Sequence, residues 1–166
     1  MDRAIGITVH TGWGACVVVE GSPARPELLA NHIIEILGDS ERFCFHRAAG
    51  MEEEAARRWI ALTRKKALAA AAAALEPFVA LGPRICAIVA KQGEAVSFTQ
   101  ALGSHPRIHT AEGLFYRDVF RDACPVPSRV VPPAALNVSA LGKLKAKPWG
   151  RDQKLAALAA WTVMGH

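Results

Sequence analysis

The amino-acid sequence predicts a single α/β domain, with a mixed sheet of three antiparallel strands followed by parallel strands, flanked by helices. Three observations predict this class. Short β-branched runs fill residues 4–37, residues 52–81 have helical periodicity, and the continuous apolar run 85–90 lies between helical segments. The chain has 166 residues, of which 51% are hydrophobic, which suffices for one domain with a substantial core. We therefore expect one domain over residues 1–166.

The first three strands are predicted from alternating and β-branched runs. Residues 4–9 and 14–19 flank Thr11-Gly12-Trp13-Gly14, where glycine permits a tight reversal, so an antiparallel hairpin is expected. After two prolines, residues 28–37 offer a third strand centred on Ile33-Ile34.

A long helix is predicted over residues 52–81, because apolar side chains recur there at spacings of three and four. Its first residues, Glu52 to Glu54, carry the charge that a helix N-terminus favours, and Pro77 is expected to kink or end it. The alanine tract 69–74 would allow close approach to a sheet or to a partner helix.

The second half of the chain alternates strands and helices. The run 85–90 has the apolar character of a strand that is buried on both faces in a parallel sheet. Thr110 is expected to cap a helix over 111–124, Val130-Val131 to form a fifth strand, and 153–164 to form a last helix.

Charge points to one candidate binding segment. The formal net charge is +5 and the sequence pI is about 9.3, which permits attraction to phosphate backbones. The clearest basic block surrounds Trp149 and comprises Lys143, Lys145, Lys147, Arg151 and Lys154. Such a block is either a polyanion contact or a solvated loop.

Composition disfavours several other classes. The longest apolar stretch, 67–75, is too short to cross a bilayer, and no secretory leader precedes the first strand, so a cytoplasmic protein without membrane contact is expected. The four cysteines are widely spaced, which disfavours a zinc knuckle or a redox pair. We interpret them as reduced core residues.

Two local patterns resemble a known family. Ile5-Gly6-Ile7-Thr8 followed by Thr11-Gly12-Trp13-Gly14 resembles the first hairpin of RuvC-type Holliday-junction resolvases. Residues 130–136, Gly142 and Asp152-Gln153-Lys154 resemble that family's strand, proline, loop and lysine-bearing helix. The resemblance implies an RNase H-like fold and a structured DNA or RNA partner. It also implies a homodimer, for which the alanine-rich helix is the candidate interface.

The carboxylates that this family uses are missing from the matching positions. RNase H-like nucleases clamp two divalent cations with several carboxylates. Here Thr8 stands at the first-strand aspartate position, the strand 85–90 has no glutamate and runs into Lys91, and the terminal helix lacks the expected acidic pair. Glu94 and Asp152 alone could be recruited. Standard two-metal nuclease activity is therefore disfavoured, and whether the chain is an enzyme stays open.

The densest group of chemically active residues is His105-Pro106-Arg107-Ile108-His109-Thr110-Ala111-Glu112-Gly113, with Arg117 one turn further. His105 is expected in a loop because of Gly103 and Pro106, and Glu112 in the first turn of the next helix. Three interpretations stay open: a structural tie in which His109 bonds Glu112 or a backbone group, an anion or nucleic-acid contact, or metal or general-base catalysis. His46 could join this group in space.

The leading hypothesis is a catalytically degenerate RNase H-like protein that binds structured nucleic acid through the basic block and Trp149. One alternative is a hydrolase or transferase of another class that uses His105, His109 and Glu112, with Arg107 and Arg117 as anion-binding residues. A protein-interaction scaffold is another. No cofactor is predicted firmly, although a divalent metal stays open, and His10 and His32 are interpreted as ordinary partly buried residues.

Overall fold

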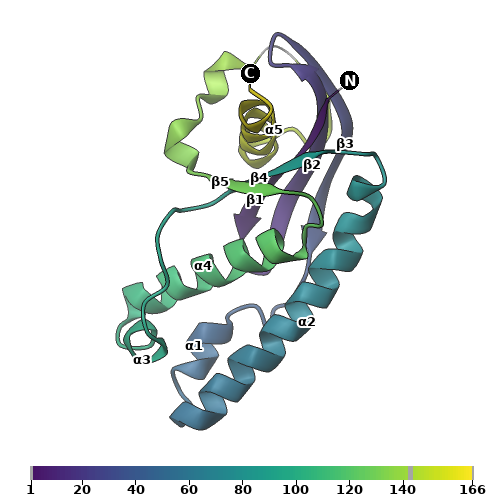
Figure 1. Ribbon diagram of the computed structural model, residues 1–166. Helices are drawn as coiled ribbons and strands as arrows, with labels where there is room; N and C mark the ends of the chain where they lie inside the picture. The colour runs from purple at the N-terminus through teal and green to yellow at the C-terminus, as the bar shows by residue number, and fades with distance from the viewer. Residues whose placement is uncertain (1, 142–143, 166) are drawn as a thin grey trace.

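A computed structural model describes residues 2–141 and 144–165 (Figure 1). Its five-stranded sheet has the order β3-β2-β1-β4-β5. The strands are β1 (Arg3–His10), β2 (Trp13–Ser22), β3 (Arg25–Glu35), β4 (Ile85–Val89) and β5 (Ser128–Val131). β2 pairs antiparallel with both β1 and β3, whereas β4 pairs parallel with β1 and β5 pairs parallel with β4. The predicted mixed sheet is confirmed.

The hairpin between β1 and β2 is as tight as predicted. His10 pairs with Trp13, so the turn consists of Thr11 and Gly12. Gly12 has a φ of +82°, a backbone conformation that favours glycine.

Seven helical segments cover the sheet or extend beyond it among the described residues 2–141 and 144–165. They are α1 (Cys44–Ala48), α2 (Glu53–Val79), α3 (Phe98–Ala101), α4 (His105–Ala123), the 3₁₀ turns η1 (Pro133–Ala135) and η2 (Val138–Ala140), and α5 (Arg151–Val163). The first half of α2 projects away from the sheet and runs beside α1 and α4 (Figure 1). None of the described helices is both long enough and apolar enough to cross a membrane.

The core has two sides because side chains alternate along the strands. Ile5 and Ile7 belong to the large cluster beneath α2 and α4, whereas Ala4 and the β4 residue Val89 belong to the clusters beneath α5. α5 approaches so closely that a Cβ atom on Gly6 would lie 1.9 Å from the Ala156 carbonyl oxygen. All four cysteines are buried and unpaired, as predicted for core residues.

The main elements have nearly the predicted bounds. The exceptions are the bounds of the third strand, two short helices that the sequence did not predict, and the start of the helix that contains Thr110. β3 begins at Arg25 and ends at Glu35, because it pairs with β2 along nearly its whole length, through a bulge beside Val18 and Val19. α1 and α3 were not predicted. α4 begins at His105 rather than at Ala111, so Thr110 is no cap; its hydroxyl donates to the Pro106 carbonyl inside the helix.

Candidate functional site

The early start of α4 places His105 and His109 on one helix face. Pro106 stands within the first helical turn, where its missing N–H costs no hydrogen bond, so it permits the helix that it was expected to interrupt. Residues at i and i+4 are neighbours on a helix surface. The Nε2 atoms of His105 and His109 accordingly lie 2.9 Å apart and share a hydrogen bond, one ring donating and the other accepting.

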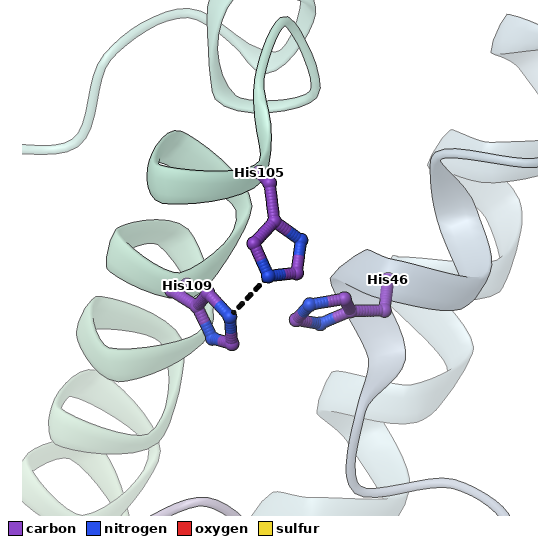
Figure 2. A group of neighbouring side chains, drawn as sticks. All are labelled: His46, His105 and His109. Carbon is purple, nitrogen blue, oxygen red and sulfur yellow. Dashed lines mark hydrogen bonds between the residues drawn. The ribbon is translucent and has the colours of Figure 1, made fainter.

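A third histidine comes from α1, far away in the sequence. The His46 ring centroid lies 4.6 Å from that of His109 and 5.2 Å from that of His105. Figure 2 shows the three rings turned toward one another, two from α4 and one from α1. One ring nitrogen of each histidine lies within 4.8 Å of one ring nitrogen of each of the others. We call these three residues the histidine cluster.

Glu112 lies next to the histidine cluster and bonds the backbone of α1 there. It is 1% exposed, and its Oε1 accepts hydrogen bonds from the backbone N–H groups of Phe45 and His46, each at 3.2 Å. The same oxygen lies 2.9 Å from Nδ1 of His46, off the line that a hydrogen bond requires. Glu112 therefore fixes α1 against α4. Glu112 lies two turns into α4 and not in its first turn as expected, and His109 bonds His105 instead of Glu112, one of the partners that the sequence left open.

Two further polar groups near Glu112, the Cys44 thiol and the Tyr116 hydroxyl, stay protonated near neutral pH. Burial, and the nearby Glu112 carboxylate, raise the pKa of the Cys44 thiol to about 12. Burial also raises the pKa of Tyr116, whose hydroxyl donates to the Arg42 carbonyl. Cys44 is thus a protonated thiol near neutral pH, which disfavours a role as nucleophile.

The two arginines of the predicted anion site lie elsewhere. Arg107 lines a cavity of about 310 Å³ whose wall includes Phe45, Val96 and Leu114 but none of the three histidines. Arg117 is buried: its Nε donates to Asp118, and its Nη1 donates to the carbonyls of Lys91 and Gly93. This geometry favours a tie that holds the segment after β4, and it does not favour the predicted anion-binding role.

A second candidate site lies where β1 and β4 end beside the start of α5. Thr8 pairs with Val89 across the two parallel strands, and the Thr8 hydroxyl donates to the Asp152 carbonyl at 2.7 Å. Nε2 of His10 lies 3.1 Å from Oδ2 of Asp152, and the His10 ring stacks on Trp13 with centroids 4.1 Å apart. We call this region the sheet edge. His10, interpreted from the sequence as an ordinary residue, is one of its polar groups.

The sheet edge has basic residues as well as one carboxylate nearby. Asp152 is a carboxylate there, while Arg151 next to it and Lys91 beyond β4 are exposed cations. Glu94 lines the cavity beside Arg107 instead. Within residues 2–141 and 144–165, the histidine cluster is the one group of three or more metal-binding side chains, so Glu94, Glu112 and Asp152 do not converge.

The basic block leads into α5. Lys145, Lys147 and Arg151 are exposed, Lys154 is half-buried, and none of these four forms an ion pair with another described residue. Lys143 lies outside the described residues. Trp149 is half-buried and packs against the core cluster beneath α5, so only part of its ring could stack on a base.

Comparisons with known proteins identify the fold. No protein-family model matches the sequence, and no curated protein is detectably similar to it. Thermus thermophilus RuvC in complex with a Holliday-junction substrate is similar in structure, with a TM-score of 0.53 and 16% identity over 98% of this chain and 92% of that one. Another Thermus thermophilus RuvC structure gives a TM-score of 0.50 and 16% identity, over 96% and 92% of the two chains. The chain thus has a RuvC-like fold, as the sequence predicts.

Proposed function

We propose that this chain is a RuvC-like protein that binds structured nucleic acid without cleaving it by the two-metal mechanism. The observation that carries the proposal is the composition of the sheet edge within a RuvC-like fold: Thr8 stands where the resemblance leads us to expect an aspartate, and it pairs with Val89 of β4, a strand without the expected glutamate. The hydroxyl of Thr8 and the isopropyl group of Val89 cannot replace two carboxylates as ligands of Mg²⁺ or Mn²⁺.

The cations around that edge support binding. Arg151 adjoins Asp152, whose carbonyl is bonded to Thr8, so the basic block reaches the sheet edge directly. Lys145, Lys147 and Arg151 are exposed and have no carboxylate partner among the described residues, so their charge is free to attract phosphates. One of the similar RuvC structures holds a Holliday junction, which makes branched DNA the first probe.

The test is a fluorescence titration with a four-way DNA junction, a matched duplex and a structured RNA, at two salt concentrations and with or without Mg²⁺ or Mn²⁺. We expect salt-sensitive binding that prefers the junction, and intact strands in every reaction. Cleavage that depends on the metal would contradict the assigned loss of the two-metal site. Absence of binding at low salt would overturn the proposal as a whole.

A homodimer through α2 remains part of this proposal. Ala67 and Ala71 of the alanine tract are buried within the chain, whereas Ala72 and Ala73 are exposed on the outer side. Leu62 is 68% exposed on the same helix. Sedimentation equilibrium of the full chain distinguishes a dimer from a monomer, and replacement of Leu62 by glutamate should weaken a dimer formed through α2.

A further inference from the structure

We infer that the histidine cluster is a binding site for a divalent transition-metal cation of the zinc type, with His46, His105 and His109 as ligands and Glu112 as the residue that positions His46. The two elements that supply the ligands are held together by Glu112, which bonds the first turn of α1 from the middle of α4. The ligand geometry is therefore fixed by the packing of two helices and not by a loop.

The distances fit a metal after small side-chain rotations. Ligands about 2.0–2.1 Å from a tetrahedral zinc ion lie about 3.3 Å from one another. In the cluster the His105 and His109 nitrogens are 2.9 Å apart, and all three ligand atoms fall within 4.8 Å. His105 and His109 are exposed, so their rings can turn toward an ion without disturbing the core.

The donor set selects the class of cation. Imidazole nitrogens suit Zn²⁺, Cu²⁺, Ni²⁺ and Co²⁺, whereas Mg²⁺, Ca²⁺ and Mn²⁺ prefer oxygen ligands. Three protein ligands also differ from the closed four-ligand set of structural zinc sites, because they leave a coordination position for water or a substrate. Cys44 does not belong to the group of side chains whose ligand atoms lie within 4.8 Å of one another, so the described residues offer three protein ligands and no thiolate.

Glu112 supplies the charge and the orientation that such a site needs. A metal-bound histidine usually directs its other ring nitrogen to a carboxylate or a carbonyl. Nδ1 of His46 lies 2.9 Å from the Glu112 carboxylate but off the line of a hydrogen bond, so a small rotation of the ring would align the two groups and leave Nε2 for the metal. A structural tie between His105 and His109 would not need the third ring, which α1 brings to the same place.

The site is independent of the proposed nucleic-acid binding. It lies between α1 and α4, whereas the basic block leads into α5 on the other face of the sheet (Figures 1 and 2). Failure of one experiment therefore does not decide the other.

The experiment uses the full chain without a histidine tag, freed of metal with a chelator. Calorimetric titration with ZnCl₂ should give one ion per chain, and titration with CoCl₂ should produce the visible absorption of a Co²⁺ ion bound by nitrogen ligands. His105→Ala and His109→Ala should each weaken Zn²⁺ binding by about tenfold or more. Affinity should also fall between about pH 8 and about pH 5.5, because protons compete for the imidazole nitrogens.

His32→Ala is the matched control, since it removes an exposed histidine outside the cluster and should leave the affinity unchanged. Glu112→Gln tests positioning: we expect weaker Zn²⁺ binding and an altered Co²⁺ spectrum, with circular dichroism reporting whether the fold persists. Equal Zn²⁺ affinity in the parent chain and in a His105→Ala/His109→Ala double variant would overturn the inference, as would a parent chain that binds no Zn²⁺.

Discussion

Removing the three exposed cations of the basic block should make nucleic-acid binding less sensitive to salt. The perturbation is Lys145→Ala, Lys147→Ala and Arg151→Ala in one chain, three changes at exposed positions. Alanine is a good helix former, so the change at the first residue of α5 should not unwind that helix. The fold should therefore persist, so a change in the salt dependence of the affinity would come from the loss of the three cations.

The magnitude follows from counterion release. Each phosphate contact contributes about −0.9 to the slope of log affinity against log salt. A rise from about 50 to about 200 mM salt therefore weakens each contact by a factor of about 3.5, and three contacts by about 40. If all three cations meet phosphates, the affinity of the parent chain should fall about 40-fold further over this range than that of the variant.

The assay is fluorescence anisotropy with a labelled four-way junction at several salt concentrations. The matched control is Arg57→Ala, Arg58→Ala and Lys65→Ala on α2, which removes the same formal charge on the opposite side of the sheet. Equal slopes for the parent chain and the basic-block variant would refute the reasoning. A slope lowered equally by the control would show that net charge, and not this segment, carries the attraction.

Two further predictions concern the fold and one of its thiols. Gly6→Ala should lower the free energy of unfolding by about 3 kcal/mol, because its Cβ would lie 1.9 Å from the Ala156 carbonyl oxygen; Gly113→Ala, on an exposed helical position with open space, should raise it by up to about 1 kcal/mol. Urea denaturation measures both, and a Gly6→Ala chain as stable as the parent would contradict the close packing of α5. A hydrogen bond from the Cys86 thiol lowers the pKa of Cys124 to about 7, from an ordinary value of 9.0. Between these pH values the unfolded chain binds more protons at this group, so stability should rise with pH from about 7 to about 9. Cys124→Ser should remove that rise, and an unchanged pH profile in the variant would disprove the assignment.

The order of the elements could be predicted because local signals agree with the tertiary structure. Alternation and β-branched runs mark the strands, and three- and four-residue spacing marks α2. α3 also carried a readable signal, since Ser97 and Gln100 form a capping box, a pattern that the sequence displays directly. α1 is only five residues long and gave no periodic pattern.

The candidate sites were predictable only in part, because each depends on contacts between distant segments. His105 and His109 were identified by their spacing, but Pro106 was interpreted as a loop residue rather than as a first-turn proline. His46 reaches them only through the packing of α1 against α4, which no local pattern encodes. The contact of His10 with Asp152 likewise joins the two ends of the chain.

The proposed absence of a two-metal site at the sheet edge agrees with how Thr8 and Val89 pack. Val89 is 1% exposed and packs with Leu155 and Ala159 of α5, and Thr8 is tied to the backbone of the same helix. Carboxylates at these two positions would be buried against apolar side chains, which is unfavourable unless cations compensate them. With Asp152 already facing His10, glutamate and aspartate introduced there would stay protonated or push α5 away before any metal bound. Replacement of Thr8 by aspartate and of Val89 by glutamate should thus lower the free energy of unfolding, which urea denaturation measures, and a double variant as stable as the parent chain would contradict this reasoning.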